Sequence, residues 1–261
     1  MSSLTYVYCL VRSPGRPSIR GTPAGMPGGQ RVRVVEVPAA GRARSATAAR
    51  DWLIVSTVPE RAYGEAAIDE GLQDLEWVAP RAVAHEAVVE HFLAAPAVLP
   101  MQLFTMFTGD DRAIEHVVRD KRRIAPILKR IERQVEWGLR LSWSPDAPLP
   151  GARARSQPQS GAAYLARKRE QRDLAQSRLK KARTQANKMH TAVSREATAA
   201  RRRTATEQAA PGSRLLLDAA YLVPARRATG FRAAVARHAR TLDGTGITVS
   251  LTGPWPAYNF I

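Results

Sequence analysis

Residues 214–223 read Arg-Leu-Leu-Leu-Asp-Ala-Ala-Tyr-Leu-Val, and this apolar run predicts a strand that Pro224 ends. Toward the C-terminus, residues 229–242 carry apolar side chains on one face, which predicts a helix. Residues 247–251 then alternate Ile, Val and Leu with polar residues, as a strand does. Upstream, residues 139–143 predict a further short strand. The C-terminal half is therefore predicted to be α/β.

A long basic segment, residues 162–208, lies between the strands predicted at 139–143 and 214–223. It contains neither Pro nor Gly. Thirteen Lys or Arg lie from Arg167 to Arg203, against three acidic residues. Apolar residues recur at alternating spacings of four and three, the seam of a coiled coil: Ala175, Leu179, Ala182, Ala186, Met189 and Val193. This pattern predicts either one helix of about 65–70 Å or a helical hairpin that breaks near Asn187. The resulting order β-α-β-α-β resembles a ferredoxin-like unit short of one strand.

The N-terminal half predicts a sheet. Residues 4–11 are apolar on both alternating faces, which is typical of a central strand covered on two sides. Residues 31–37 and 51–58 predict two more strands, the first of them ended by Pro38. The Pro- and Gly-rich stretch 13–30 predicts a long flexible connection between the first two strands.

Helical patterns and one more strand follow. Residues 63–77 and 81–93 have apolar side chains at helical spacing. Residues 98–107 are nearly all apolar and predict one short buried strand. Either Asp110 or Asp111 is expected to cap the next helix.

Breaker residues mark the remaining boundaries. Pro126 interrupts a helical pattern, either as a kink or as the first residue of a new helix. Gly138 marks a boundary before a strand, and residues 144–160 predict a linker rich in Pro, Gly and Ser. We therefore expect an N-terminal α/β domain at 1–136 and a C-terminal domain at 137–261 that is ferredoxin-like with a long basic helix or hairpin.

Length and composition narrow the class of protein. The chain has 261 residues, which suits two modest domains. No apolar run approaches the roughly 18–20 residues that span a bilayer, and the first residues lack the pattern of a signal peptide. Cys9 is the single cysteine, which excludes an internal disulfide and a multi-cysteine metal site. We expect a cytoplasmic protein without membrane contact.

The net charge of +17 attracts anions, and the basic segment allows two interpretations. In one, the stripe from Arg167 to Arg203, ending in Arg201, Arg202 and Arg203, neutralises phosphates in a nucleic-acid-binding adaptor. In the other, a solvated helix meets a protein partner through its Ala seam. Tyr164 is the only aromatic residue of the segment, which disfavours base stacking and hence nucleic acid.

Motifs for catalysis, cofactors and metals do not emerge. His85-Glu86 invites comparison with the zinc motif H-E-x-x-H, but the position of the second His is Val89. A buried helix histidine is the expected role of His85. The Gly-rich residues 21–29 contain neither the G-K-[ST] of a phosphate-binding loop nor the G-x-G-x-x-G of a dinucleotide-binding loop. Cys9 is expected to be a buried thiol. We therefore expect no enzyme activity, no cofactor and no metal site.

The aromatic tail, residues 253–261, is the most distinctive segment. It holds four large apolar side chains: Trp255, Tyr258, Phe260 and Ile261. If the tail were free, these side chains would form an exposed apolar patch. Either it straps back over the protein's own core or part of it docks on another protein, and the two can coexist.

The closing Leu251-Thr-Gly-Pro-Trp-Pro-Ala-Tyr-Asn-Phe260 resembles the terminal signature of the gas vesicle protein L/F family. Further segments resemble that family in order: Tyr6-Val-Tyr8, Ala84-His-Glu-Ala-Val-Val89, Val98-Leu-Pro100, Gln134-Val-Glu136, Gly161-Ala-Ala-Tyr-Leu165 and Leu215–Val223. The resemblance implies an N-terminal α/β domain and a modified ferredoxin-like domain. It also implies an accessory or minor structural protein that helps to assemble gas vesicles. Its partners would be the small hydrophobic major shell protein and other accessory proteins.

One segment departs from the family pattern. Where the family commonly has an Arg-Phe-Gly-Thr-like run after Leu-Pro, this chain has Gln102-Leu-Phe-Thr105, so the Arg and the Gly are missing. If relatives use that Arg in a contact, the departure implies a paralogue with a different partner preference.

Overall fold

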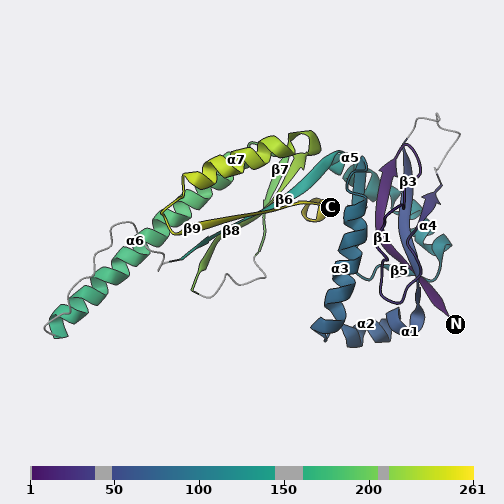
Figure 1. Ribbon diagram of the computed structural model, residues 1–261, viewed down its shortest axis with the longest axis horizontal. Coiled ribbons are helices and arrows are strands. Elements are labelled where there is room, and N and C mark those ends of the chain that lie inside the picture. Colours follow the sequence, from purple (N-terminus) through teal and green to yellow (C-terminus); the bar gives the residue numbers. More distant parts are fainter. Residues whose placement is uncertain (1, 39–48, 145–160, 205–211) are drawn as a thin grey trace. The chain divides into compact units, whose positions relative to one another are not determined.

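The computed structural model describes residues 2–38, 49–144, 161–204 and 212–261 (Figure 1). The chain falls into two compact units. The first holds Met1–Val135 together with Trp255–Ile261, and the second holds Glu136–Pro254. The last seven residues, expected at the end of the C-terminal domain, therefore group with the N-terminal unit. Most of the predicted linker, residues 145–160, lies outside the described residues.

The N-terminal unit is built on a five-stranded antiparallel sheet of order β2-β3-β1-β4, with β5 also paired to β1. Its strands are β1 (Ser3–Ser13), β2 (Arg33–Val37), β3 (Arg50–Pro59), β4 (Ala97–Pro100) and β5 (Met106–Phe107). The prediction of three early strands, with the first in the centre, is confirmed.

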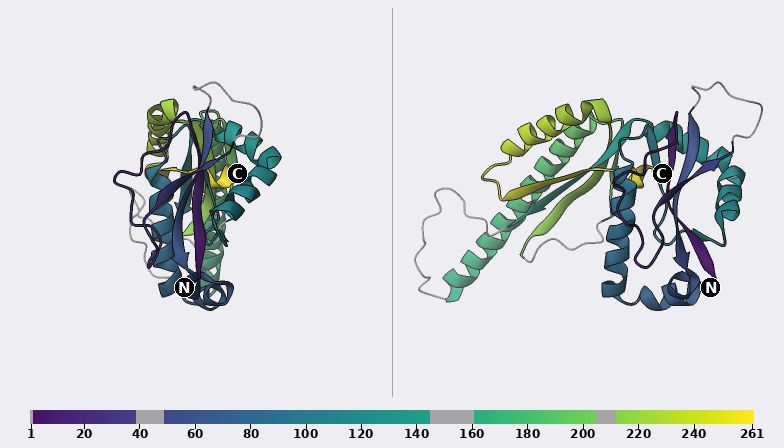
Figure 2. Two further views of the ribbon diagram at one scale, coloured as in Figure 1. Left: turned by 90° about the vertical axis from the view of Figure 1, so that its right-hand side faces the viewer. Right: turned by 45° about the vertical axis from the view of Figure 1, so that its right-hand side comes forward.

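Helices cover both faces of this sheet, α3 on one and α4 on the other (Figures 1 and 2). The helices of this unit are α1 (Glu60–Tyr63), α2 (Glu65–Gly71), α3 (Leu75–His91), α4 (Asp110–Arg119) and α5 (Lys121–Ile131). Because β1 is covered on two sides, its residues 5–11 are all buried. This burial explains why the strand shows no polar face in its sequence.

The Gly-rich connection before β2 is held to the core, in contrast to the flexible loop predicted there. Met26 is buried, and its backbone N–H donates to the Tyr8 hydroxyl at 2.8 Å. Gly25 has a φ of 84°, and a Cβ there would lie 2.5 Å from the same hydroxyl. Only glycine fits this turn and this close approach.

The predicted helix at 63–77 is wrong as a single element. The chain breaks at Gly64 and again at residues 72–74, giving α1, α2 and the start of α3. The Asp74 side chain accepts a bond from the Glu76 N–H and caps α3. That helix then continues through Pro80, which the apolar spacing of 81–93 did not reveal.

The predicted single strand at 98–107 is also wrong, because β4 and β5 are separated by residues 101–105. Phe104 lies in this turn with a φ of 65°, a left-handed conformation that is uncommon for a bulky residue. Its backbone N–H donates to the Tyr6 hydroxyl at 3.3 Å. The turn interrupts the pairing with β1, and β5 resumes it in the same direction as β4, at the start of β1.

The expected aspartate cap of α4 is wrong, and the structure excludes one of the two alternatives for Pro126. Gly109 rather than an aspartate is the N-cap of α4, because the Asp110 carboxylate is already bound by Arg33 at 2.8 Å and by Thr5 at 2.8 Å. The break between α4 and α5 falls at Asp120, and Pro126 lies inside α5. Pro126 is therefore not the first residue of a new helix.

The second unit is a four-stranded sheet of order β7-β8-β6-β9 with two helices on one face (Figure 1). Its elements are β6 (Gln134–Trp143), α6 (Gly161–Ser194), β7 (Ala199–Arg202), β8 (Arg214–Pro224), α7 (Ala228–Arg240) and β9 (Ile247–Trp255). The order β-α-β-β-α-β is a complete ferredoxin-like unit. The prediction of one missing strand is corrected by β7.

The strand β7 lies inside the segment that was predicted to be helical throughout. The helix α6 ends at Ser194 without a break at Asn187, so the hairpin alternative is wrong. The Thr198 N–H donates to the Leu222 carbonyl at 2.8 Å, and pairing with β8 continues from there. Ala-Ala-Arg-Arg has no strand pattern of its own, so this tertiary pairing decides its structure.

Gly138 lies within β6 rather than at a boundary. A Cβ there would stand 2.7 Å from the Thr252 hydroxyl on β9. The glycine therefore reflects close approach of two strands and not a turn.

Candidate functional site

The C-terminal tail packs on the N-terminal unit to which it belongs (Figure 1). Phe260 is 3% exposed, and the Tyr258 hydroxyl donates to Oε2 of Glu86 on α3 at 2.7 Å. Trp255 is half-buried, whereas Ile261 is exposed. The expected strap over a core is thus confirmed for the tail's Phe260 and Tyr258, while Trp255 and Ile261 keep outward surface.

The contact between the tail and α3 is sheltered from water. Burial raises the pKa of the Glu86 carboxyl above its ordinary value. Burial also raises the pKa of the Tyr258 hydroxyl, and the Glu86 carboxylate raises it further. The hydroxyl therefore keeps its proton and acts as a donor at neutral pH.

His85 lies in the core beneath this contact. Its Nδ1 is 2.7 Å from the Tyr6 hydroxyl, and it is 4% exposed. Burial lowers the pKa of His85 to about 4, so the ring is neutral at neutral pH. The expected buried helix histidine is confirmed. Among the residues that the structure describes, no three His, Cys, Asp or Glu are grouped to hold a metal ion.

Cys9 is a fully buried thiol on β1, as predicted. Burial raises its pKa, which keeps the thiol protonated and unreactive. Within the described ranges, no helix combines the length and apolarity needed to cross a membrane.

The long helix α6 has two halves with different surroundings. In the second half the predicted seam is buried, with Ala182, Ala186, Met189 and Val193 at most 3% exposed. The first half, residues 164–177, is here called the free half, and it extends beyond the strands of its sheet (Figures 1 and 2). Its large apolar side chains are about half exposed: Tyr164 at 53%, Leu165 at 59% and Leu174 at 49%.

The three arginines predicted on the basic helix lie elsewhere. Arg201 and Arg202 are on the edge strand β7, and Arg203 follows it. Arg202 donates to the Asn187 side chain at 2.7 Å, and Arg203 donates through Nε to Asp218 at 2.7 Å. The hydrogen bond to buried Asp218 gives Arg203 a structural role, so these arginines do not continue a helical phosphate-binding stripe.

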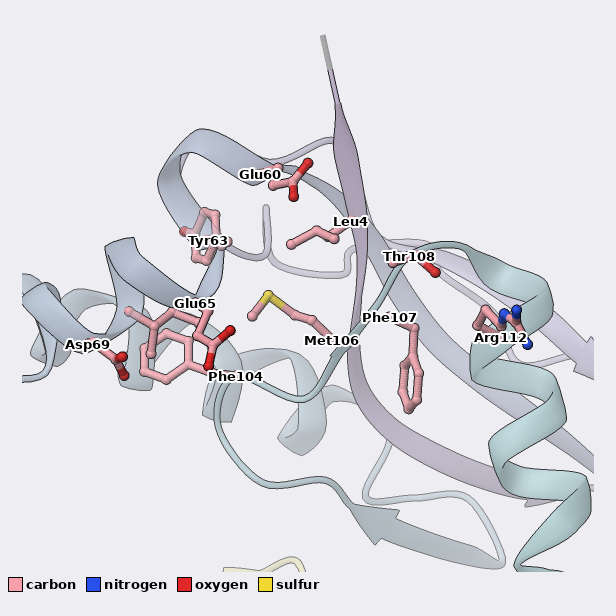
Figure 3. A pocket seen from close by; sticks show the side chains of 12 residues that line it. Leu4, Glu60, Tyr63, Glu65, Asp69, Phe104, Met106, Phe107, Thr108 and Arg112 are labelled. Carbon is pink, nitrogen blue, oxygen red and sulfur yellow. The ribbon is translucent and has the colours of Figure 1, made fainter.

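A groove in the N-terminal unit was not predicted. It has a volume of about 620 Å³ and lies between α1–α2 and the segment that leads from β5 into α4 (Figure 3). It is here called the α2 groove. Its apolar lining comes from Leu4, Tyr63, Ile68, Phe104, Met106 and Phe107.

One wall of the α2 groove is a fixed aromatic cluster. The rings of Phe104 and Trp77 are 5.4 Å apart, and those of Tyr63 and Trp77 are 6.5 Å apart. The Arg81 guanidinium lies 3.8 Å from the centre of a Trp77 ring, a cation–π contact. Phe104, which has a left-handed backbone conformation, joins this cluster through its ring contact with Trp77, at the segment where the chain departs from the family pattern.

The rim of the α2 groove is acidic. Glu60, Glu65 and Asp69 line it, and no ion pair or side-chain hydrogen bond joins them to any described residue. Arg112 lines the groove on the α4 side and is paired with Glu115 at 2.9 Å (Figure 3). The sequence feature that could have indicated this groove is the acidic composition of residues 60–76, which is unusual in so basic a chain. The groove therefore offers apolar contact and negative charge.

Comparison with known proteins gives a consistent result. The family model described as "Gas vesicle synthesis protein GvpL/GvpF" matches residues 4–261. A curated relative, gas vesicle protein L of Streptomyces sp. (strain CB03234), is 32% identical over 219 residues, covering 79% of this chain and 78% of the relative.

Two solved structures share the fold. The crystal structure of GvpF from Anabaena sp. PCC7120 matches with a TM-score of 0.66 and 14% identity, over 99% of this chain and 96% of that one. The crystal structure of GvpF from Microcystis aeruginosa matches with a TM-score of 0.59 and 13% identity, over 100% and 99%. At such low identity these two matches speak for the fold alone.

Proposed function

Because the chain belongs to the gas vesicle protein GvpL/GvpF family, we propose that it is an accessory or minor structural protein that helps to assemble the vesicle. It binds the major shell protein and other accessory proteins in the cytoplasm and is associated with the gas vesicle. It catalyses no reaction and needs no cofactor.

The observation that carries this proposal is the free half of α6. Tyr164, Leu165 and Leu174 are about half exposed there. Tyr164 and Leu165 are adjacent, and exposed apolar side chains on a helix are typical of a surface that another protein covers. A hydrophobic shell protein is a partner whose own surface would bury them, and a few such anchors supply most of an interface's affinity.

The tail adds a smaller contribution to the proposed interface. Trp255 and Ile261 keep exposed surface, while Tyr258 and Phe260 hold the tail in place. Basic side chains on the edge strand β7, Arg201 and Arg202 among them, attract acidic partners and make the encounter sensitive to salt.

Nucleic-acid binding is the competing function. The exposed basic residues of the free half favour it, whereas the hydrogen bonds of Arg202 to Asn187 and of Arg203 to Asp218 do not. Phosphate binding weakens steeply as salt rises, and apolar binding does not. Salt dependence therefore separates the two functions.

The test is co-sedimentation of the purified protein with the major shell protein at low and moderate salt. We expect saturable binding that survives moderate salt. The double variant Tyr164→Ser and Leu165→Ser should weaken it at least tenfold. A matched control, Ile19→Ser and Val83→Ser, removes equally exposed apolar side chains elsewhere and should leave binding unchanged.

A duplex and a single-stranded oligonucleotide serve as parallel ligands. Absent shell binding together with tight, salt-sensitive binding of either oligonucleotide would overturn the proposal. Equal loss of shell binding in the test and control variants would show that the free half of α6 is not part of the interface.

A further inference from the structure

The α2 groove has the chemistry of a site for a cationic and apolar ligand. Its floor is apolar, and the carboxylates of Glu60, Glu65 and Asp69 lack a counter-ion among the described residues. The surrounding residues 60–76 hold one basic side chain, Arg61, against six acidic ones: Glu60, Glu65, Asp69, Glu70, Asp74 and Glu76. Like charges gathered around a groove repel nucleic acid, phosphate and anionic lipid.

Negative charge at this place is unusual for a chain with a net charge of +17. Forty Lys and Arg are available, yet none pairs with the three groove carboxylates among the residues described. Two exposed apolar side chains, Leu72 and Leu75, extend the apolar surface at the end of α2 and the start of α3. The surface therefore combines acids and apolar groups, and it fits a segment that combines bases and apolar groups.

The free half of α6 has that composition. Within residues 164–177, four basic residues stand against two acidic ones, and the four are Arg167, Lys168, Arg169 and Arg172. Leu165, Lys168 and Arg172 follow the i, i+3, i+7 spacing and so share one helix face, with Tyr164 beside them. Lys168 and Arg172 are exposed, and the Lys168 ammonium lies 6.0 Å from the centre of the Tyr164 ring.

We propose that the α2 groove of one copy of this protein receives the free half of α6 from a second copy. Tyr164 and Leu165 enter the apolar groove, where Phe104 and Met106 contact them. Lys168 and Arg172 pair with the carboxylates of the rim, which no other described group neutralises.

The aromatic wall suits this role because it is already in place before binding. The Arg81 guanidinium and the rings of Tyr63, Trp77 and Phe104 hold one another, so little side-chain entropy is lost when a helix docks. The free half is likewise a formed helix. Both surfaces are therefore preorganised.

Such an interface is head-to-tail, because groove and helix are different surfaces of the same chain. A head-to-tail contact between two copies leaves one groove and one helix unused, so further copies can add until a ring closes or an open chain forms. A helix of about four turns buries an area near the low end of specific interfaces. We therefore expect association that depends on protein concentration and weakens with salt.

The test is sedimentation velocity of the full chain over a concentration series at low and moderate salt. The wild type should form larger species as its concentration rises. A groove variant, Glu65→Lys with Asp69→Lys, and a helix variant, Lys168→Glu with Arg172→Glu, should each associate at least tenfold more weakly. The matched control Lys180→Glu with Lys181→Glu changes charge on the packed half of α6 and should associate like wild type.

The decisive measurement is the association of the two charge-reversed variants when they are mixed. In an equimolar mixture each reversed surface meets a partner of opposite charge, so association should return to near the wild-type level. Circular dichroism of each variant checks that folding is intact. A wild type that stays monomeric at every concentration, or a mixture that stays dissociated, would overturn the inference.

This inference does not depend on shell binding. The groove variant keeps the free half of α6, so it should bind the major shell protein at least as well as wild type. Loss of shell binding with unchanged self-association in this variant would assign the groove to the shell protein and refute the self-docking proposal.

Discussion

The C-terminal tail and the free half of α6 are both rich in apolar side chains, yet their surroundings are opposite. Phe260 of the tail is 3% exposed, whereas Leu165 of the helix is 59% exposed. The tail ends against α3 of its own unit. The helix has 34 residues, or about 50 Å, and outruns the 11-residue strand β8, which spans about 36 Å.

This contrast shows that hydrophobicity alone does not identify a docking surface. Tyr258 and Phe260 of the tail are used to stabilise the fold, and they are not available to a partner unless the tail detaches. The free half of α6 contributes little to the fold, because almost all of its residues are exposed. Mutations in the two segments should therefore separate stability from binding.

The largest expected effect is on stability and comes from the tail. Phe260→Ala removes a buried ring and should lower the free energy of unfolding of the N-terminal unit by about 3 kcal/mol. Leu165→Ala removes an exposed side chain and should change it by less than about 0.5 kcal/mol. Urea unfolding of both variants, followed by circular dichroism, measures the difference.

If both substitutions lowered the free energy of unfolding by similarly small amounts, the proposed contrast between the tail and the helix would be wrong. The tail would then be bound too weakly to matter for stability, and Phe260 would return as a candidate partner contact.

The next effect concerns pH and the core beneath the tail. The pKa of His85 is about 4 in the folded protein, against an ordinary value of 6.5. Between these values the unfolded chain binds more protons, so stability falls as pH falls from 6.5 to 4. The lowered pKa amounts to roughly 3 kcal/mol of lost stability across this window.

His85→Asn is the matched variant, because its amide oxygen can accept the Tyr6 hydroxyl proton without titrating. Burial raises the pKa of Glu86, which contributes with the opposite sign. Since Glu86 is present in both proteins, the difference between wild type and variant isolates His85. Urea unfolding at pH 7, 6, 5 and 4 should show this difference, and Leu165→Ala should follow the wild-type curve. Parallel curves for wild type and His85→Asn would contradict the assignment.

The sequence predicted those parts of the fold whose pattern is local. The strands β1 and β8 are long apolar runs, and the buried half of α6 follows a regular seam of small residues. The strapping role of the tail could also be anticipated, because its Trp, Tyr, Phe and Ile would otherwise lie exposed.

Elements decided by tertiary contacts were not predictable. The strand β7 is Ala-Ala-Arg-Arg, which reads as helix until β8 supplies its partner. The left-handed Phe104 gives no local signal, and it lies in the turn of residues 101–105 that divides an apolar run into the short strands β4 and β5. The α2 groove needed both the acidic composition of 60–76 and this turn, and only the first is visible in the sequence.

The smallest effect tests how the tail is held. Tyr258→Phe keeps the ring and removes the hydroxyl that donates to Glu86 at 2.7 Å. We expect a loss of about 1–2 kcal/mol, because the Glu86 carboxylate then lies sheltered without its donor. Amide hydrogen exchange of the tail should become faster by an amount that reflects this loss of stability. Exchange in the free half of α6 should not change. Glu86→Gln is the control, since adding Tyr258→Phe to it should cost less than in wild type. Full additivity of the two substitutions would show that the hydroxyl–carboxylate bond does not hold the tail, and that the apolar packing of Phe260 does.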